Sequence, residues 1–313
     1  MEAVECTGLC PDGHQLALNS YENRVFQVGM EQRPPMVAKF YRPDRWSDDQ
    51  IREEHSFTTL LADAEIPVVA PWRDSGDRSL FACAGFRFAL FARHGGRAPE
   101  PGDLEQLEWI GRFVGRIHLA GQAAPFRHRP TLDVASMGWH ARQEVLGSPL
   151  LPPHEHDAYA AISENLLERV ERQLQETGAD QIRLHGDCHH GNILWTDQGP
   201  HFVDLDDCRN GPAVQDLWML LNGDRSERTV QLSAMLEGYT LFHAFDPREL
   251  ALIEPLRALR MLHYSGWVAR RWSDPAFPAA FPWVASPHYW SQHVQDLRHQ
   301  QAVMEDEPPL RLF

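Results

Sequence analysis

Residues 185–192 of the chain read His-Gly-Asp-Cys-His-His-Gly-Asn, and residues 203–207 read Val-Asp-Leu-Asp-Asp. Two short apolar runs, 193–195 and 201–203, lie between these segments and flank the polar stretch Thr196-Asp197-Gln198-Gly199. Apolar runs separated by such a stretch predict a β-hairpin. The polar and charged residues of the two quoted segments cluster at the ends of the predicted hairpin.

Three of these residues have the chemistry that phosphoryl transfer needs. Asp187 and Asn192 are five positions apart, and Asp204 follows across the predicted hairpin. One carboxylate must orient the attacking hydroxyl and accept its proton, while other oxygen ligands hold Mg²⁺ against the phosphates. Mg²⁺ prefers hard oxygen ligands, which Asn and Asp supply. A kinase catalytic loop also has Asp and Asn five apart, with a metal-binding Asp after them.

The rest of the chain predicts an α+β fold. Alternating or apolar runs predict strands at 24–28, 36–40, 80–83 and 86–91, and a helix at 48–61. Apolar residues at helical spacing predict helices from Asp103 to Gly121 and up to Gly178, and further helices at 226–243 and 248–272. The Pro- and aromatic-rich stretch 275–290 is expected to be an ordered surface wrap.

A strand-rich first third followed by a helix-rich remainder predicts two lobes. We expect a small, mainly β N-terminal lobe at residues 1–92 and a larger, mainly α C-terminal lobe at residues 93–313. The loop from His94 to Gly102 is the candidate hinge.

The bulk composition excludes several functions. The formal net charge of −15 over 313 residues disfavours binding to nucleic acid or to an anionic membrane. No stretch of about 20 apolar residues and no secretory leader is visible. Five cysteines, an odd number without a dense framework, favour reduced thiols. We therefore expect a soluble cytoplasmic protein.

Longer motifs carry a resemblance to a known family. The segments LHGDCHHGNILW and VDLDDCRNGPAVQDLWMLLNG resemble the aminoglycoside-phosphotransferase and choline-kinase branch of the protein-kinase-like fold. With LNSYENRVFQV, VAKFYRPDRW and RRWSDPAFP, the chain from Leu18 onward is similar to the bacterial stress response kinase A group, also called RdoA or YihE. The resemblance implies a bilobal, monomeric, cytoplasmic, ATP- and Mg²⁺-dependent Ser/Thr protein kinase that acts on a protein with a Ser/Thr acceptor; the kinase itself is one candidate acceptor.

The resemblance also implies roles for individual residues. Asp187 would orient and deprotonate the acceptor hydroxyl, and Asn192 and Asp204 would hold Mg²⁺. Lys39 would contact the α- and β-phosphates and pair with Glu53 on the next helix, with Glu54 as the less favoured partner. The remaining nucleotide contacts would come from Ser20 to the phosphates and from Phe91 and Ala92 to the adenine.

The chain departs from protein kinases in ways that keep alternatives open. The loop 19–23 has no GxGxxG; Asn19, Ser20 and Asn23 offer polar groups instead. Gly186 stands where the HRD motif has Arg, and no long activation segment with an APE motif follows Asp204. A kinase for an amino alcohol, sugar or aminoglycoside therefore remains an alternative. A non-catalytic nucleotide-binding or scaffold protein is a second.

Neighbouring side chains have simpler interpretations. His185, Cys188, His189 and His190 could form a zinc site, but no paired CxxC or helical HxxxH supports it. We expect His185 to be buried and bonded to the loop backbone. His189 and His190 either line the substrate cleft or face solvent. No motif supports a thiol mechanism for Cys188.

Overall fold

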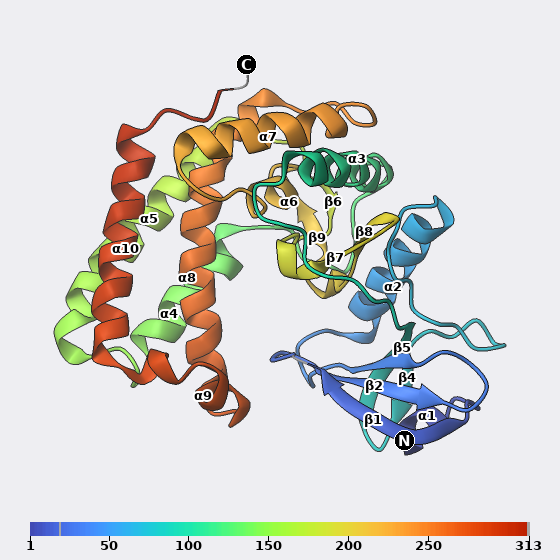
Figure 1. Ribbon diagram of the computed structural model, residues 1–313. Coiled ribbons are helices and arrows are strands. Elements are labelled where there is room, and N and C mark those ends of the chain that lie inside the picture. Colours follow the sequence, from blue (N-terminus) through green and yellow to red (C-terminus); the bar gives the residue numbers. More distant parts are fainter. Residues whose placement is uncertain (19, 312–313) are drawn as a thin grey trace. The chain divides into compact units, whose positions relative to one another are not determined.

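The computed structural model describes residues 1–18 and 20–311, and Asn19 lies outside the described residues (Figure 1). The chain divides into two units, each with its own internal packing. The first comprises Met1–Pro130, Ile182–Asn210 and Met219–Phe245, and the second comprises Thr131–Gln181, Gly211–Trp218 and Asp246–Phe313. The predicted sheet and the segment 185–207 therefore belong to the same unit.

An antiparallel sheet forms the first part of this unit. Its strand order is β1-β2-β3-β5-β4, with bounds β1 Pro11–Leu18, β2 Arg24–Met30, β3 Met36–Phe40, β4 Phe81–Cys83 and β5 Phe86–Ala92. The four strands predicted from the sequence are confirmed to within two residues at each end. The sequence did not predict β1, because nearly all of its side chains are exposed and show no burial alternation.

The two faces of the sheet have different neighbours. Ala38 on β3 packs in a cluster with Phe88 and with Val4 of α1 (Glu2–Glu5). Residues on a strand alternate between faces, so the adjacent Lys39 points to the other side. There Tyr41 and Ala89 pack with Ile51 of α2 (Asp48–Asp63). Lys39 is thus on the face that α2 covers.

Helix α2 begins with a capping box. The side chain of Ser47 accepts a hydrogen bond from the backbone N–H of Gln50, and the Gln50 side chain accepts one from the Ser47 N–H. Its buried residues recur at intervals of three and four, which is the spacing of one helix face. They are Ile51, Glu54, His55, Phe57, Thr58 and Leu61.

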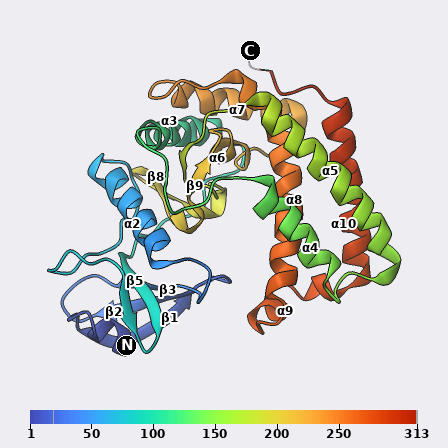
Figure 2. The same cartoon turned by 180° about the vertical axis from the view of Figure 1, so that it is seen from behind.

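Two helices of the first unit pack with little separation between their backbones. Helices α3 (Leu104–Gly121) and α7 (Arg225–Tyr239) lie side by side in both views (Figures 1 and 2). A Cβ at Gly111 would lie 2.0 Å from the carbonyl oxygen of Met235, so this contact needs glycine. Asp103, where the sequence predicted the helix to begin, caps α3 by accepting a hydrogen bond from the Gln106 N–H.

The segment around the decisive motifs consists of short elements. The predicted hairpin is confirmed as β7 (Ile193–Thr196) and β8 (Gly199–Phe202). The elements around it are β6 Ile182–Leu184, η3 His190–Asn192, η4 Leu205–Asp207 and β9 Arg209–Gly211. Backbone hydrogen bonds tie the hairpin to the loops next to the five-stranded sheet: the Phe202 N–H donates to the Pro67 carbonyl oxygen, and the Trp195 N–H to that of Arg97.

The second unit is helical. In both views α4 and α8 run side by side, as do α5 and α10 (Figure 2). Its elements are η1 Ala135–Trp139, α4 His140–Leu146, η2 Pro153–Glu155, α5 His156–Thr177, α6 Gln215–Trp218, η5 Pro247–Leu252, α8 Ile253–Arg271, α9 Ala276–Ala280, η6 Pro282–Ala285 and α10 Pro287–Asp306. Helix α5 ends at Gly178 in the left-handed conformation, as expected for a glycine C-cap.

One sequence prediction in this unit was wrong. The stretch 275–290 is not a surface wrap, because it contains α9, η6 and the start of α10. Phe277, Phe281 and Trp290 are buried, so three of its aromatic residues belong to the core, whereas Trp283 is exposed. The α+β class is confirmed, and no helix among the described residues is long and apolar enough to span a membrane.

Candidate functional site

The β7–β8 hairpin brings Asn192 and Asp204 together. Ile193 pairs with Phe202, so the residues before β7 and after β8 lie at the same end of the hairpin. There the Val203 N–H donates a hydrogen bond to the carbonyl oxygen of Asn192, with an N–O distance of 3.0 Å. Asp204 is the next residue, so the two predicted metal ligands are neighbours through backbone pairing.

Asp187 lies at the same place. Nδ2 of Asn192 donates to the carbonyl oxygen of Asp187 at 3.0 Å and to its Oδ2 at 3.3 Å. Nε2 of His189 lies 3.4 Å from the same Oδ2. Because Nδ1 of His189 accepts the Gly191 N–H, the neutral imidazole carries its proton on Nε2, facing the carboxylate. The Asn192 N–H donor and the nearby His189 ring therefore orient the Asp187 side chain.

His185 holds the loop from inside. It is 1% exposed, its Nε2 lies 3.0 Å from the carbonyl oxygen of Val203, and its Nδ1 lies 3.4 Å from the Asp187 backbone nitrogen. The prediction that His185 is buried and bonded to the loop backbone is confirmed. Through these contacts the backbone of Asp187 is fixed relative to the strand end that carries Asp204.

Gly186 explains why no arginine precedes the proposed base. Its φ of +84° lies in the left-handed region, and a Cβ there would be 2.2 Å from the carbonyl oxygen of Asp207. Any side chain at this position would collide with the Asp207 backbone. The departure from HRD is therefore a packing requirement of this loop.

Asp204 adopts an unusual backbone conformation. It is a non-glycine residue with φ 59° and ψ 61°, and its side chain is 53% exposed. Left-handed backbone at a non-glycine residue costs roughly 1–3 kcal/mol and concentrates at functional sites. The conformation turns the chain sharply between β8 and η4 and leaves the carboxylate accessible.

Lys39 connects the sheet to the acidic segment 204–207. Its Nζ lies 2.9 Å from Oδ1 of Asp204, 3.0 Å from Oδ1 of Asp206 and 3.7 Å from Oε1 of Glu54. The lysine side chain is only 8% exposed. Burial alone would lower the pKa of Lys39, but Asp204, Asp206 and Glu54 outweigh it and raise the pKa well above its usual value. Lys39 is therefore positively charged.

The prediction that Glu53 pairs with Lys39 is wrong, and Glu54 is the partner. Consecutive helix residues point about 100° apart, so only one of the two can face β3. Glu54 lies on the buried face of α2. Glu53 instead accepts hydrogen bonds from three consecutive backbone N–H groups, those of Arg127, His128 and Arg129, at 2.6–2.8 Å. It thereby fixes the loop that carries Arg129.

A chain of polar side chains lies next to Lys39 on this face. Nζ of Lys39 is 5.3 Å from the centre of the Tyr41 ring. The Tyr41 hydroxyl is 2.8 Å from Nε2 of His55, and Nδ1 of His55 is 2.8 Å from Oγ of Ser79. Burial, with Lys39 adding repulsion, lowers the pKa of His55 to about 3, so the imidazole is neutral.

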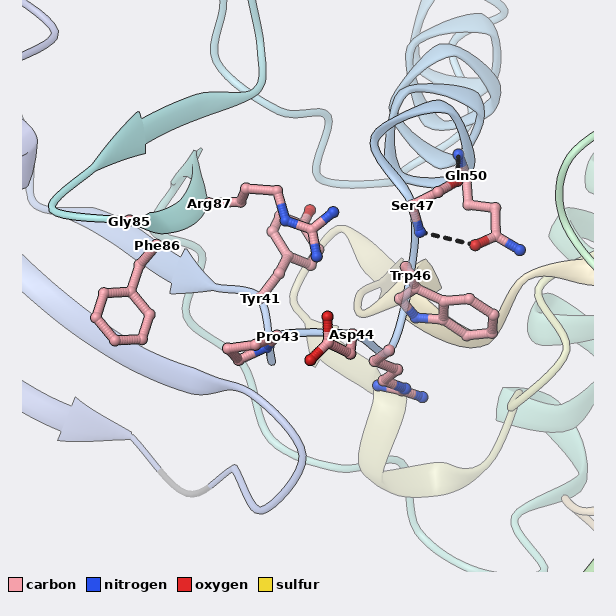
Figure 3. A pocket seen from close by; sticks show the side chains of 10 residues that line it. Tyr41, Pro43, Asp44, Trp46, Ser47, Gln50, Gly85, Phe86 and Arg87 are labelled. Atoms are coloured by element: carbon pink, nitrogen blue, oxygen red, sulfur yellow. Dashed lines mark hydrogen bonds between the residues drawn. The ribbon is translucent and has the colours of Figure 1, made fainter.

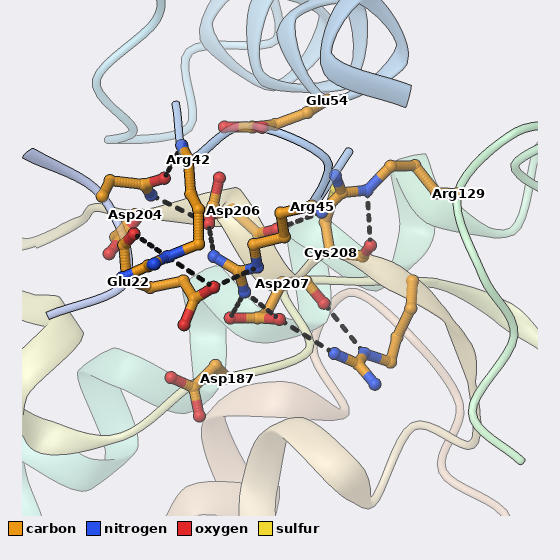
Figure 4. Close-up of polar contacts among 12 residues, drawn as sticks. Glu22, Arg42, Arg45, Glu54, Arg129, Asp187, Asp204, Asp206, Asp207 and Cys208 are labelled. Atoms are coloured by element: carbon orange, nitrogen blue, oxygen red, sulfur yellow. Dashed lines mark hydrogen bonds and ion pairs between the residues drawn. The ribbon is translucent and has the colours of Figure 1, made fainter. Parts of the chain in front are cut away.

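Two arginines that the sequence analysis did not select hold the acidic segment after Asp204 (Figure 4). The guanidinium of Arg45 contacts Asp206, and its Nη2 lies 2.9 Å from both carboxylate oxygens of Asp207. Arg129 donates to the carbonyl oxygens of Asp206 and Cys208. Burial would lower the pKa of Arg45, but Asp207, Asp206 and Glu22 raise it. The Arg-Pro-Asp-Arg-Trp segment 42–46 follows the Lys39 strand directly, which places Arg45 near the site, but nothing local marks this arginine or Arg129 as buried.

The loop before β2 is tied to the same segment. Nδ2 of Asn23 donates to Oδ2 of Asp206 at 3.0 Å, and its Oδ1 accepts the Arg42 N–H. Asn23 is 4% exposed, so its side chain serves the loop and not a phosphate. Glu22 lies 3.3 Å from Nε of Arg42. Ser20 is half-buried at the start of this loop.

The two residues predicted to contact the adenine, Phe91 and Ala92, lie at the end of strand β5. Phe91 on β5 pairs with Val37 on β3, and its ring meets that of His55 edge-on, with ring centres 6.3 Å apart. Its side chain is thus on the same face as Lys39. Ala92 is exposed at the end of β5.

A hollow of about 510 Å³ lies elsewhere in this unit (Figure 3). It is bounded by the segment after β3, the start of α2 and the β4–β5 turn, including Tyr41, Trp46 and Arg87. Neither Lys39, Asp187, Asn192 nor Asp204 lines it. The candidate active site is defined instead by the converging side chains.

The oxygen atoms at the hairpin end suit Mg²⁺. Asn192 uses its Nδ2 toward Asp187, which leaves its carbonyl Oδ1 for a cation, and the Asp204 carboxylate is accessible. Within residues 1–18 and 20–311, no group of three or more His, Cys, Asp or Glu side chains is arranged to hold a metal by itself. Mg²⁺ at Asn192 and Asp204 would thus complete its coordination with phosphate oxygens, as it commonly does.

Comparison with known proteins assigns the chain to a family. The model of a family described as "Phosphotransferase enzyme family" matches residues 14–253. The chain is 46% identical over 312 residues to "Serine/threonine protein kinase RdoA" of Salmonella typhimurium and to "Stress response kinase A" of Escherichia coli K12. Each alignment covers 100% of this chain and 94% of the relative.

Solved structures with low sequence identity share the fold. An amicoumacin kinase in complex with AMP-PNP and Ca²⁺ aligns with a TM-score of 0.73 at 19% identity, covering 99% of this chain and 93% of that one. An aminopropanol kinase aligns with a TM-score of 0.68 at 17% identity, covering 94% of this chain and 92% of that one. A spectinomycin phosphotransferase aligns with a TM-score of 0.66 at 14% identity, covering 96% of this chain and 97% of that one. The fold is that of the protein-kinase-like phosphotransferases.

Proposed function

Because the chain belongs to the phosphotransferase enzyme family and within it to the stress response kinase A group, we propose that it is a Ser/Thr protein kinase using Mg-ATP. The observation that carries the proposal is the convergence of Asp187, Asn192 and Asp204 at one end of a hairpin, with Nζ of Lys39 2.9 Å from Asp204. We place the reaction in the cytoplasm, with a monomeric enzyme and its own Ser/Thr residues among the acceptors.

Asp187 is the base in this proposal. Its carboxylate is partly exposed, accepts a hydrogen bond from Nδ2 of Asn192, and has Nε2 of His189 3.4 Å away. A carboxylate so oriented accepts a hydrogen bond from an acceptor hydroxyl and takes its proton as transfer proceeds. These contacts fix the direction in which its oxygens point.

Asn192 and Asp204 hold the metal, and Lys39 holds the α- and β-phosphates. Bound Mg-ATP supplies the transferable γ-phosphoryl group and the charge that neutralises it. Glu54 and Asp206 keep Lys39 extended toward Asp204, so the cation is aimed before a phosphate arrives. Ser20 contacts the phosphates, and Phe91 and Ala92 contact the adenine.

The two-lobe division at residue 92 is part of this proposal. The nucleotide would lie between the sheet of residues 1–92 and the catalytic segment. Both belong to the first unit. Within it, the side chains of Lys39, Asn23 and Arg45 contact the acidic segment 204–207.

A kinase for a small hydroxyl-bearing molecule is the second candidate. After Asp204 the chain enters the short η4 and then β9, and no extended segment follows there in the described part of the chain. Protein kinases use such a segment after the metal-binding Asp. The chain therefore lacks one element by which a peptide acceptor is usually held.

Labelling with γ-³²P-ATP separates these candidates. The full-length protein is incubated with Mg-ATP alone, with a generic protein acceptor, and with amino alcohols or aminoglycosides. Label on Ser or Thr, located by mass spectrometry and lost in Asp187→Ala, supports the protein kinase. Label found only on an added small molecule supports the second candidate, and no Mg²⁺-dependent label at all contradicts both.

A further inference from the structure

Two cysteines far apart in the sequence have their sulfur atoms in contact. Sγ of Cys6 lies 3.5 Å from Sγ of Cys83, although the residues are 77 positions apart. Cys6 is exposed and Cys83 is half-buried. Neither residue takes part in the proposed phosphotransfer.

The fold holds both cysteines in defined positions. Cys6 directly follows α1, and α1 is anchored by Val4, which is 1% exposed and packs with Phe81 and Phe88. Cys83 is the last residue of β4 and pairs with Phe86 on β5. Because each cysteine is on a packed element, the contact between the sulfurs belongs to the fold of the sheet.

The other three cysteines lack this combination of access and partner. Cys188 and Cys208 are buried, and burial raises the pKa of Cys208 to about 12, which keeps it protonated and inert. Cys10 is exposed, but no sulfur contact is described for it within residues 1–18 and 20–311. It therefore serves as a matched control for Cys6.

We propose that Cys6 and Cys83 form an oxidant-reactive dithiol, a modification site that closes to a disulfide with peroxide. The sulfurs are 3.5 Å apart and need to approach to about 2 Å for a bond, a change that side-chain rotation at the surface supplies. In reducing compartments such pairs are transient and redox-sensing and do not act as permanent cross-links.

The reaction balances without a cofactor. The Cys6 thiolate attacks one oxygen of hydrogen peroxide, the O–O bond breaks, and Cys6 becomes a sulfenic acid while the other oxygen leaves as hydroxide, which takes up the proton that Cys6 released and becomes water. The Cys83 sulfur then attacks the Cys6 sulfur. The S–S bond forms, the S–O bond breaks, and hydroxide leaves with the Cys83 proton as a second water. Two thiols lose two electrons and one peroxide becomes two waters.

The contact itself assigns the order of these steps. The hydrogen bond with Cys6 raises the pKa of Cys83, so Cys83 retains its proton more strongly. Cys6 is also the more exposed of the two. Cys6 therefore meets the peroxide, and Cys83 resolves the sulfenic acid.

The site lies on the face of the sheet away from Lys39. Cys83 packs against the cluster that contains Ala38 and Val4, whereas Lys39 points to the α2 face. Closure would tie the N-terminal segment to the edge strand β4 and stabilise the sheet by restricting the unfolded chain. The proposal is therefore independent of the proposed function, and its readout is not activity.

The test uses the full-length protein. Wild type, Cys6→Ser, Cys83→Ser and Cys10→Ser are treated with hydrogen peroxide, alkylated, and digested without reductant for mass spectrometry. We expect a peptide linked through Cys6 and Cys83, and two fewer alkylated thiols, in wild type and in Cys10→Ser. Cys83→Ser should instead leave a sulfenic acid on Cys6, which dimedone traps.

Other outcomes would overturn the proposal. A Cys6–Cys10 link, a link between two molecules, or loss of the link in Cys10→Ser would assign the reactivity elsewhere. An unchanged thiol count in peroxide-treated wild type would show that no disulfide forms and would contradict the proposal. As a second readout, the oxidised wild type should melt several degrees above its reduced form, and dithiothreitol should reverse the shift; an unchanged melting temperature contradicts the closure.

Discussion

Nζ of Lys39, on the third strand of the sheet, lies 2.9 Å from Oδ1 of Asp204, which follows the β7–β8 hairpin. The contact joins the residue proposed to hold the phosphates to the residue proposed to hold the metal. It is part of a buried charge network, because Asp206 and Glu54, each 3% exposed in their side chains, share the same lysine. Function and stability are therefore coupled at Lys39.

Replacing Lys39 should damage both properties. In Lys39→Met, Asp206 and Glu54 lose a cation while they stay buried, which should cost roughly 3–5 kcal/mol of unfolding free energy. Urea unfolding measures this loss, and phosphotransfer is then assayed at a temperature where the variant is folded. Lys39→Arg is the control, since it keeps the charge. Unchanged stability in Lys39→Met would contradict the network.

Asp187→Asn should separate binding from chemistry. The amide keeps the shape of the carboxylate but cannot accept the hydroxyl proton, so the turnover rate should fall at least about 100-fold. Affinity for the nucleotide, measured by calorimetry with a non-hydrolysable analogue, should change little, because Lys39, Asn192 and Asp204 are intact. Full transfer in this variant would remove Asp187 from the mechanism.

Adjacent glutamates offer a matched pair. Burial raises the pKa of Glu54 to about 7, and Glu54→Gln removes this acidic partner of Lys39; it should lower kcat/KM about 10-fold or more through misplacement of the lysine. Glu53→Gln weakens the hydrogen bonds from three backbone N–H groups and should mainly cost about 1–2 kcal/mol of stability. Steady-state kinetics and urea unfolding on both variants check this split. The reverse pattern would favour Glu53 as the partner of Lys39.

Arg45→Gln should lower activity because Asp206 and Asp207 lose the cation that they share, although Lys39 and Arg209 still contact one carboxylate each. We expect a stability loss of roughly 1–3 kcal/mol with a larger proportional loss in turnover. Arg52→Gln is the control, because Arg52 pairs with Asp48 and Asp49 at the surface and should contribute less than about 0.5 kcal/mol. Equal effects of the two substitutions would argue against a role for Arg45.

His55 should make the fold sensitive to acid. Its pKa is about 3 in the folded protein against 6.5 for an ordinary histidine, so the unfolded chain binds more protons between these values. The stability contributed by neutral His55 is fully present above pH about 6.5 and is lost as the pH falls toward about 3, at up to about 1.4 kcal/mol per pH unit. Urea midpoints at several pH values should show a shallower acid decline in His55→Gln. An identical decline would exclude His55 as its source.

The sequence predicted the parts of the site that lie close together in the chain. Asp187, Asn192 and Asp204 are grouped by one hairpin, whose apolar runs and polar turn are legible without a structure. Glu54 was also within reach, because it is three residues after Ile51 and seven before Leu61 on the buried helix face. The choice of Glu53 failed because the register of α2 against β3 was not known.

Contacts between distant segments were not predictable in this way. Arg45 and Arg129 reach Asp206 across separations of 161 and 77 residues, and nothing local marks an arginine as buried. Strand β1 and helix α10 were not predicted because of their own local sequence. The first is exposed along most of its length, and the second begins inside a Pro- and aromatic-rich stretch that resembled a loop.

The crowded backbone at Gly186 limits how this enzyme could change over evolutionary time. A single nucleotide substitution can turn a glycine codon into an arginine codon, yet here the new side chain would meet the Asp207 carbonyl. The stretch 204–208 would first have to move, and Arg45 and Arg129 hold it in place. Regulation in which a phosphate group binds an arginine at position 186 would therefore need several coordinated mutations in this sequence.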